Sequence, residues 1–154
     1  MGVQFVDLIE QLDPDDNRRG KQFERICKWF LDNDPGYSFD RVWLWDQWPG
    51  RWGGDCGIDL VARDHTGRIW AIQAKCYAAT TSITKSDVDK FLSESNRPEI
   101  DVRLLVVSTN NVAANATRVM KTQDKPVHQV LRSGLDAAPL VWPEDPDDLS
   151  GGVS

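Results

Sequence analysis

Three polar residues on two neighbouring predicted strands have the types and spacing to bind a divalent metal and attack a phosphodiester. Asp59 lies in a glycine-flanked apolar run, 57–63, while Gln73 and Lys75 lie in a second run, 68–76. Because side chains alternate along a strand, Gln73 and Lys75 share one face, and a hairpin can bring Asp59 beside them. A carboxylate, an amide oxygen and an ammonium group at one sheet edge suit metal-assisted hydrolysis.

The chemistry of such a site requires a second acid. Magnesium prefers oxygen ligands in octahedral geometry and keeps several waters. A water made more acidic by the metal would attack phosphorus, while Lys75 stabilises the developing charge and can also accept the proton of that water. Gln73 supplies no negative charge, so Asp59 alone would hold magnesium weakly. Glu24 lies about 85° from the centre of the apolar stripe of its predicted helix, at the edge of the buried face, where its carboxylate can face the sheet.

The segments that must position these residues read as an α/β protein. Apolar spacing and capping residues predict a short helix near the N-terminus, and then longer helices at 18–33, 84–96 and 112–124. Strands are predicted at 39–45, 57–63, 68–76, 102–108 and 127–131. Helices interleaved with strands in this order predict a mixed central sheet flanked by helices.

One domain is expected from a chain of 154 residues. We place it at 1–142, with a helical N-terminal segment at 1–16 and a core at about 18–142. Residues 143–154 form an acidic tail or linker whose composition predicts disorder.

Charge and cysteine content narrow the function classes. The net charge of −6 argues against a free-standing, sequence-indifferent DNA binder, although residues 41–103 carry nine acids and nine bases and so can offer phosphates a local track. The chain has three cysteines without Cys-x-x-Cys spacing, which suggests a reducing cytoplasm and no structural zinc. No apolar run is long enough to cross a membrane.

The motifs resemble a known nuclease family. Gly-x-Asp-x-Gly-Ile-Asp at 53–59, Ile-Gln-Ala-Lys at 72–75 and a glutamate on a preceding helix resemble the Mrr-like branch of the PD-(D/E)xK nuclease superfamily. More narrowly, they are similar to the N-terminal nuclease modules of helicase-containing restriction enzymes, including the type ISP group. The resemblance spans roughly 20–142 and implies a restriction-endonuclease-like αβββαβ core with the site at one edge of the sheet.

The resemblance also implies roles for individual residues. Asp59 matches the metal-binding aspartate and Lys75 the catalytic lysine. Gln73 stands where most of the superfamily has an acid and this branch has glutamine. Glu24 matches the helical glutamate that completes the metal site, and the backbone carbonyl of Ala74 would be a further metal ligand.

The cofactor and partners implied by the resemblance are those of a restriction enzyme. Mg²⁺ is the expected cofactor, with Mn²⁺ as a substitute, and double-stranded DNA is the expected substrate. Helicase or translocase and methyltransferase or target-recognition regions of a parent polypeptide would supply affinity and site choice. Because one site cuts one strand, a double-strand break would need transient pairing of two nuclease domains.

Further residues are candidates for DNA contact or support. These are Arg51 and Trp52 in the loop before the motif, Lys85 and Lys90 on the following helix, and Asp55 as support for the hairpin. The tryptophans around that loop suit core packing, and aromatic groups also suit wedging into DNA. Two alternatives stay open: a degenerate nuclease fold that only binds nucleic acid or protein, and a junction resolvase or repair nuclease.

Overall fold

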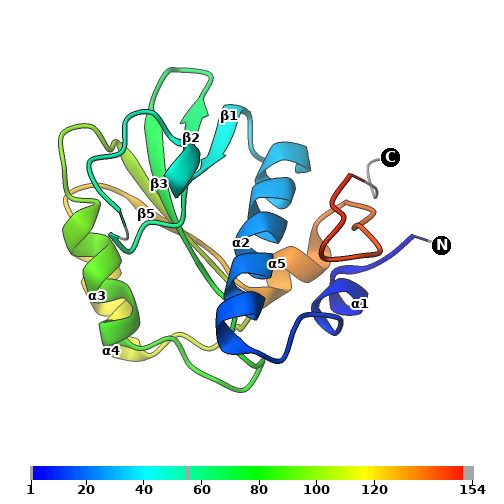
Figure 1. The fold of residues 1–154 in the computed structure, drawn as a ribbon. Coiled ribbons are helices and arrows are strands. Elements are labelled where there is room, and N and C mark those ends of the chain that lie inside the picture. The colour runs from blue at the N-terminus through cyan, green and yellow to red at the C-terminus, as the bar shows by residue number, and fades with distance from the viewer. Residues whose placement is uncertain (1, 55, 151–154) are drawn as a thin grey trace.

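The computed structural model describes residues 2–54 and 56–150, which form a five-stranded sheet with helices on both faces (Figure 1). The spatial order of the strands follows the chain: β1 (Phe39–Leu44), β2 (Leu60–Asp64), β3 (Ile69–Lys75), β4 (Val102–Val107) and β5 (Val127–Val130). β2 runs antiparallel to its neighbours β1 and β3, whereas β3, β4 and β5 are parallel. The predicted α/β class with a mixed central sheet is therefore confirmed.

Two hydrophobic cores fill the space between the sheet and its helices. One face packs against α1 (Phe5–Ile9), α2 (Asp16–Asn33) and α5 (Arg132–Ala137). The other packs against α3 (Lys85–Glu94), α4 (Ala114–Lys121) and the short 3₁₀ turn Trp45–Gln47. All six residues of β4 are buried, as expected of a central strand covered on both faces.

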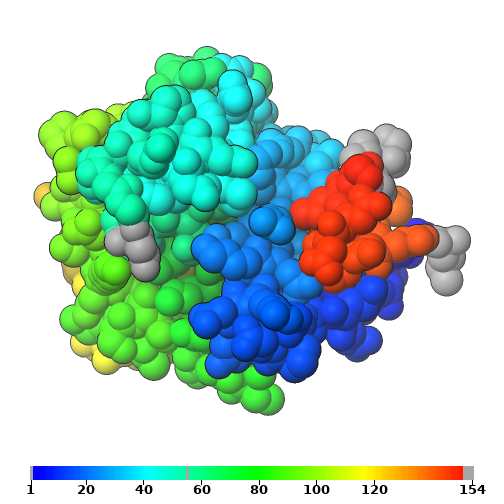
Figure 2. All heavy atoms as spheres, viewed as in Figure 1, coloured from blue at the N-terminus to red at the C-terminus, as the bar shows by residue number. Residues whose placement is uncertain are grey.

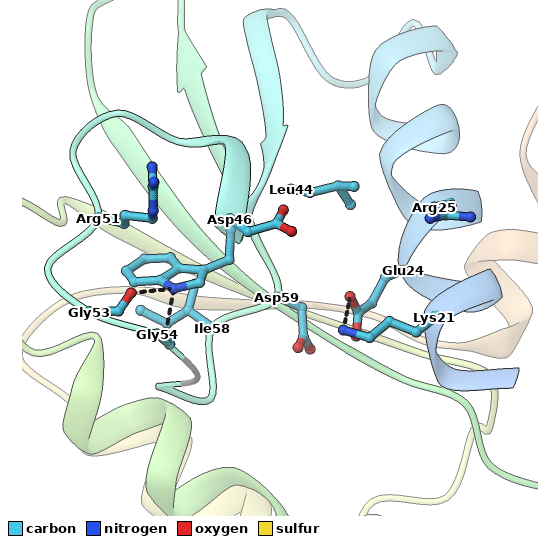
Figure 3. Close-up of a pocket in the computed structure, with 11 residues that line it drawn as sticks. Lys21, Glu24, Arg25, Leu44, Asp46, Arg51, Gly53, Gly54, Ile58 and Asp59 are labelled. Atoms are coloured by element: carbon cyan, nitrogen blue, oxygen red, sulfur yellow. Dashed lines mark hydrogen bonds and ion pairs between the residues drawn. The ribbon is translucent and has the colours of Figure 1, made fainter. Parts of the chain in front are cut away.

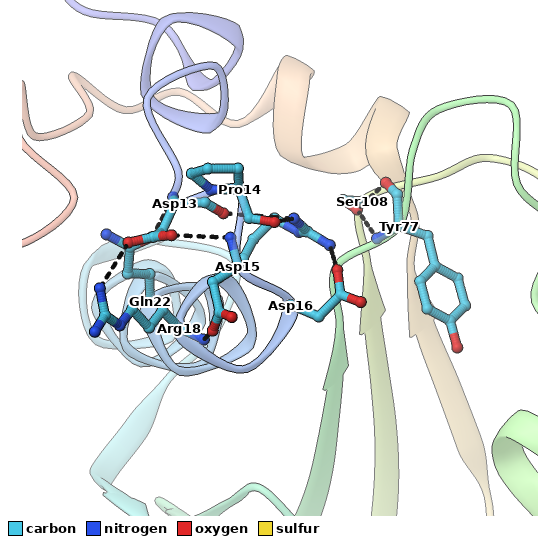
Figure 4. Close-up of polar contacts among 9 residues, drawn as sticks. Asp13, Pro14, Asp15, Asp16, Arg18, Gln22, Tyr77 and Ser108 are labelled. Atoms are coloured by element: carbon cyan, nitrogen blue, oxygen red, sulfur yellow. Dashed lines mark hydrogen bonds and ion pairs between the residues drawn. The ribbon is translucent and has the colours of Figure 1, made fainter.

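The N-terminal end of α2 is fixed by a set of acidic residues (Figure 4). The Asp15 carboxylate caps the helix by accepting a hydrogen bond from the backbone N–H of Arg18 at 3.0 Å. The backbone N–H of Asp13 donates to Gln22 Oε1 at 2.7 Å, which ties the preceding turn to the second turn of the helix. These contacts set the position of the helix that carries Glu24.

Asp64 organises the turn between β2 and β3, at the far end of β2 from Asp59. Its carboxylate accepts hydrogen bonds from the backbone and hydroxyl of Thr66, from the backbone and guanidinium of Arg68, and from the indole of Trp70. Desolvation opposes ionisation, but these hydrogen bonds lower the pKa of Asp64 well below its usual range. Gly67 completes the turn with φ of 86°, a conformation that favours glycine.

Differences from the sequence prediction lie at element ends. The second strand begins at Leu60 rather than 57, because Gly57 has φ of 80° and breaks the extended backbone. Helix α5 was not predicted from the sequence.

The first eight residues of the predicted tail, 143–150, follow a defined path past the N-terminal helices. Gln11 donates to the Glu144 carbonyl at 2.7 Å, and Gln22 donates to the Asp147 carboxylate at 3.0 Å. Residues 151–154, the remainder of that tail, lie outside the described residues. Just before it, Trp142 is 1% exposed and stacks on Phe30, so the core extends to this residue.

Within the described ranges, no helix combines the length and apolarity that crossing a membrane would require.

Candidate active site

Backbone contacts with β3 hold the Asp59 carboxylate at the edge of the sheet. Leu60 pairs with Ile72 in the antiparallel β2–β3 ladder, and the Asp59 N–H donates to the Ile72 carbonyl at 2.9 Å. Asp59 Oδ2 accepts a hydrogen bond from the Ala74 N–H at 2.8 Å. The predicted hairpin therefore places Asp59 beside the strand that carries Gln73 and Lys75.

The Gln73 amide is buried with one of its two ends unsatisfied. Gln73 is only 5% exposed, and its Nε2 donates a hydrogen bond to the Gly57 carbonyl at 3.3 Å. This contact assigns the amide orientation, because a carbonyl can only accept. Gln73 Oε1 is then a buried acceptor without a hydrogen-bond partner among the described residues. Such an atom costs about 1–3 kcal/mol, and a cation at this position would satisfy it.

The Ala74 carbonyl points toward the same region. The carbonyls of Ile69 and Lys75 accept bonds from the β4 side, so the alternate residues of β3 face β2. Ala74 is one of these, as its N–H donates to Asp59. Because the β2 ladder ends at the pair Leu60–Ile72, the Ala74 carbonyl points past the end of β2, beside the Asp59 carboxylate.

Glu24 approaches from the opposite wall. Figure 3 shows Glu24 on α2 and Asp59 at the start of the hairpin projecting into the same cavity. The Glu24 side chain is 21% exposed and forms a long ion pair with Lys21, at 3.9 Å. The helical acid and the hairpin acid are thus brought together from distant parts of the chain.

Two clefts meet at this pair of acids. The first, here called the lysine cleft, has a volume of about 860 Å³ and is lined by all five predicted site residues: Glu24, Asp59, Gln73, Ala74 and Lys75. The second, the arginine cleft, has a volume of about 550 Å³ and is lined by Glu24, Asp59, Arg25 and Arg51 among others. Figure 2 shows this face of the molecule hollowed between α2 (blue) and the segments in cyan and green.

A metal at this site would rest on two carboxylates. Across residues 2–54 and 56–150, no three His, Cys, Asp or Glu side chains gather into a metal cluster. The donor set around the acids is instead mixed: two carboxylates, the unsatisfied amide oxygen of Gln73 and a backbone carbonyl. All four are oxygen donors, the type that magnesium prefers.

Two hydrogen bonds between Ser108 and the backbone of Tyr77, here called the Ser108 clasp, fix the chain just after Lys75. Ser108 Oγ, at the end of β4, accepts from the Tyr77 N–H and donates to the Tyr77 carbonyl, both at 2.7 Å (Figure 4). The Tyr77 hydroxyl donates to Asp87 at 2.8 Å. Desolvation and this carboxylate raise the pKa of Tyr77 to about 12.

Asp87 brings a further ionised carboxylate close to the lysine. Desolvation opposes its ionisation, but hydrogen bonds from Thr84 and Tyr77 and the charge of Lys75 lower the pKa of Asp87. It lines the lysine cleft and also caps α3. Asp87 and Tyr77 were not predicted, because their role depends on a contact between β3 and a helix that the local pattern does not encode.

The predicted DNA-contact residues divide into two groups. Arg51 lines the arginine cleft, and Lys90 lines the lysine cleft. Lys85 pairs with Asp89 at 3.0 Å and lines neither cleft, so it is not brought to the site. Asp55 lies outside the described residues.

The tryptophan-rich loop is a packed support. Trp43, Trp45 and Trp48 are each at most 8% exposed and belong to the core beneath α3 and α4. Trp52 packs edge-on against Trp45, and the Arg97 guanidinium covers its ring at 4.0 Å. The faces of these rings are occupied within the protein, which favours packing over wedging into DNA.

Arg25 also lines the arginine cleft, although no pattern in the sequence predicts it as a site residue. It is exposed on α2 one position after Glu24, and it forms no ion pair within the described part of the chain. Arg25 and Arg51 border the arginine cleft from opposite sides (Figure 3). An arginine on a helix surface is usually only solvated. Arg25 differs because the loop that carries Arg51 lies opposite it and forms the other side of the cleft.

Comparisons with known proteins agree with this architecture. A family model described as restriction endonuclease matches residues 32–147, a range that includes Asp59, Gln73 and Lys75 but not Glu24. No curated protein sequence matches the chain.

Solved structures similar to this chain include two restriction enzymes. One is the ATP-dependent Type ISP restriction-modification enzyme LlaBIII bound to DNA, with 29% identity and a TM-score of 0.75 over 89% of this chain and 9% of that chain. The other is the MspJI restriction endonuclease in complex with a 27-mer oligonucleotide, with 21% identity and a TM-score of 0.53 over 79% of this chain and 28% of that chain. The MspJI similarity concerns the fold alone, and the chain spans only a small part of either protein.

Proposed function

Because this chain belongs to the restriction endonuclease family, we propose that it is a Mg²⁺-dependent endodeoxyribonuclease domain and the nuclease module of a larger ATP-dependent restriction-modification enzyme. The observation that carries the proposal is the buried, unsatisfied Oε1 of Gln73, a residue that lines one cleft together with Asp59, Glu24 and Lys75.

The donor set fits a divalent cation. Asp59 and Glu24 would neutralise its charge, and Gln73 Oε1 and the Ala74 carbonyl would complete the protein ligands. Mn²⁺ prefers similar donors and would substitute. When bound, the cation supplies Lewis acidity to the scissile phosphate and lowers the pKa of water in the site.

The chain's own groups perform the remaining tasks. The Ala74 N–H holds the Asp59 carboxylate in one orientation. Lys75, on the same strand, places positive charge in the cleft, where it stabilises the negative charge that develops on the phosphoryl oxygens. The Ser108 clasp on Tyr77 fixes the strand end that carries this lysine.

We infer that the chain acts as one module of a larger enzyme. The chain corresponds to 9% of the Type ISP enzyme to which it is similar, and its net charge of −6 predicts weak affinity for DNA by this domain alone. Motor and methyltransferase or target-recognition regions of the parent would bring double-stranded DNA to the cleft. Two modules would have to pair transiently to break both strands.

Conversion of supercoiled plasmid to nicked circles tests the proposal. A closed circle has no ends, so only an endonuclease converts it. We expect nicking by the wild-type chain at low salt with Mg²⁺, none with EDTA and none by Asp59→Asn. Binding without nicking would instead indicate a degenerate nuclease fold, and strong preference for a branched duplex would indicate a junction resolvase.

A further inference from the structure

Packing within the protein does not explain why residue 20 of α2 is a glycine. It is the fifth residue of the 18-residue helix Asp16–Asn33, where glycine destabilises relative to alanine. A Cβ built on Gly20 would meet no atom within 4 Å outside the helix backbone. No neighbouring atom among the described residues therefore requires residue 20 to lack a side chain.

The surface of Gly20 faces the candidate site. Gly20 lines the lysine cleft, one helical turn before Glu24. Residues four apart on a helix lie on the same face, so Gly20 continues the wall that carries the Glu24 carboxylate. A bare patch of helix backbone thus borders the cleft directly beside the acids.

The two clefts can accommodate a chain that continues on both sides of the acids. Glu24 and Asp59 line both clefts. Arg25 and Arg51 border the arginine cleft, and Lys90 borders the lysine cleft. None of these three cations pairs with a carboxylate within the described part of the chain, so each can bind a phosphate without first breaking an ion pair.

We propose that one DNA strand runs through both clefts and contacts helix α2 at Gly20, with the scissile phosphate facing the cation position between Glu24 and Asp59. This inference rests on the proposed nuclease function and adds the path of the substrate. Gly20 is the point of closest approach, where a side chain would push the sugar–phosphate backbone away from the acids. Arg25 and Arg51 hold the phosphates on the other side of the cut.

Substitutions at Gly20 test the path, because stability and DNA binding should change in opposite directions. Alanine and leucine are both better helix formers than glycine, so Gly20→Ala and Gly20→Leu should raise Tm by about 2–4 °C. Both should weaken binding of a fluorescein-labelled duplex, measured by anisotropy at low salt. We expect a loss of about threefold for alanine and at least about tenfold for leucine, the latter equivalent to about 1.4 kcal/mol.

Matched controls lie on α4, which borders neither cleft. Thr117→Ala and Thr117→Leu replace a residue inside that helix without altering the charge, and they should leave DNA binding unchanged. In parallel, Asp59→Asn tests cleavage independently of the path.

The outcomes separate the two proposals. Stabilised Gly20 variants that bind DNA less tightly, in order of side-chain size, support the path. Gly20 variants that bind and cut like wild type overturn it, while loss of nicking in Asp59→Asn would still support the nuclease. A wild-type chain that neither binds nor cuts DNA overturns both.

Discussion

Replacement of Gln73 by glutamate tests whether its unsatisfied oxygen faces a cation. In the metal-free protein, Gln73→Glu removes the hydrogen bond to the Gly57 carbonyl, which is 3.3 Å from Nε2, and adds a carboxylate beside Asp59 and Glu24. An unsatisfied buried group costs about 1–3 kcal/mol, and crowding of like charges adds a similar amount. The metal-free Tm should therefore fall by about 5–15 °C.

Magnesium should reverse part of this loss. A charged ligand in place of a neutral one strengthens binding of a divalent cation, and a tenfold gain in affinity corresponds to about 1.4 kcal/mol. Binding to the folded state alone stabilises it, so saturating Mg²⁺ should narrow the gap in Tm by about 3–6 °C.

Thermal unfolding in EDTA and across a Mg²⁺ titration, with calorimetry of Mg²⁺ binding, measures both effects. Gln129→Glu is the matched control. Gln129 is an exposed residue of β5, and β4 separates this strand from the strand that carries Gln73. Equal Mg²⁺ affinity of Gln73→Glu and wild type would refute the assignment of Oε1 as a ligand.

Three further predictions concern chemistry, acid stability and domain extent. Asp59→Asn and Lys75→Ala should each reduce plasmid nicking by at least about a thousandfold and change Tm by less than about 4 °C, and nicking at wild-type rates by either variant would remove that residue from the mechanism. Because the pKa of Asp64 is lower in the folded protein, its stabilising contribution is present above about pH 4, the usual range of a free aspartate, and is lost as pH falls toward the folded pKa. Asp64→Asn should therefore flatten the acid limb of a stability–pH curve while Mg²⁺-dependent nicking persists; an unchanged acid limb would contradict this. Removal of 143–154 should leave a folded domain. In contrast, Trp142→Ala should lower the free energy of unfolding, measured in urea, by about 3–5 kcal/mol. A truncated chain that fails to fold would show that the tail belongs to the domain.

Much of the fold could be predicted because its elements carry strong local patterns. The stripe of Phe23, Ile26 and Phe30 predicts α2, and the continuous apolar run of β4 predicts a central strand. The start of β2 was misplaced because the positive φ of Gly57 cannot be distinguished from an ordinary strand glycine in the sequence.

The strand residues of the site were predictable, and its surroundings were not. Period-two alternation alone places Gln73 and Lys75 on one face. The contact of Asp87 with Tyr77 and the position of Arg25 depend on how distant helices pack against the sheet, and no spacing in the sequence records this. The charge of Lys85 predicts a contact with phosphate, but Asp89 on the same helix pairs with it.

The location of a bound cation tests the central claim most directly. Crystals of the chain soaked in Mn²⁺ would reveal the metal by its anomalous scattering. We expect one strong peak between the carboxylates of Glu24 and Asp59, within coordinating distance of Gln73 Oε1. A peak elsewhere, or none at saturating Mn²⁺, would contradict the account.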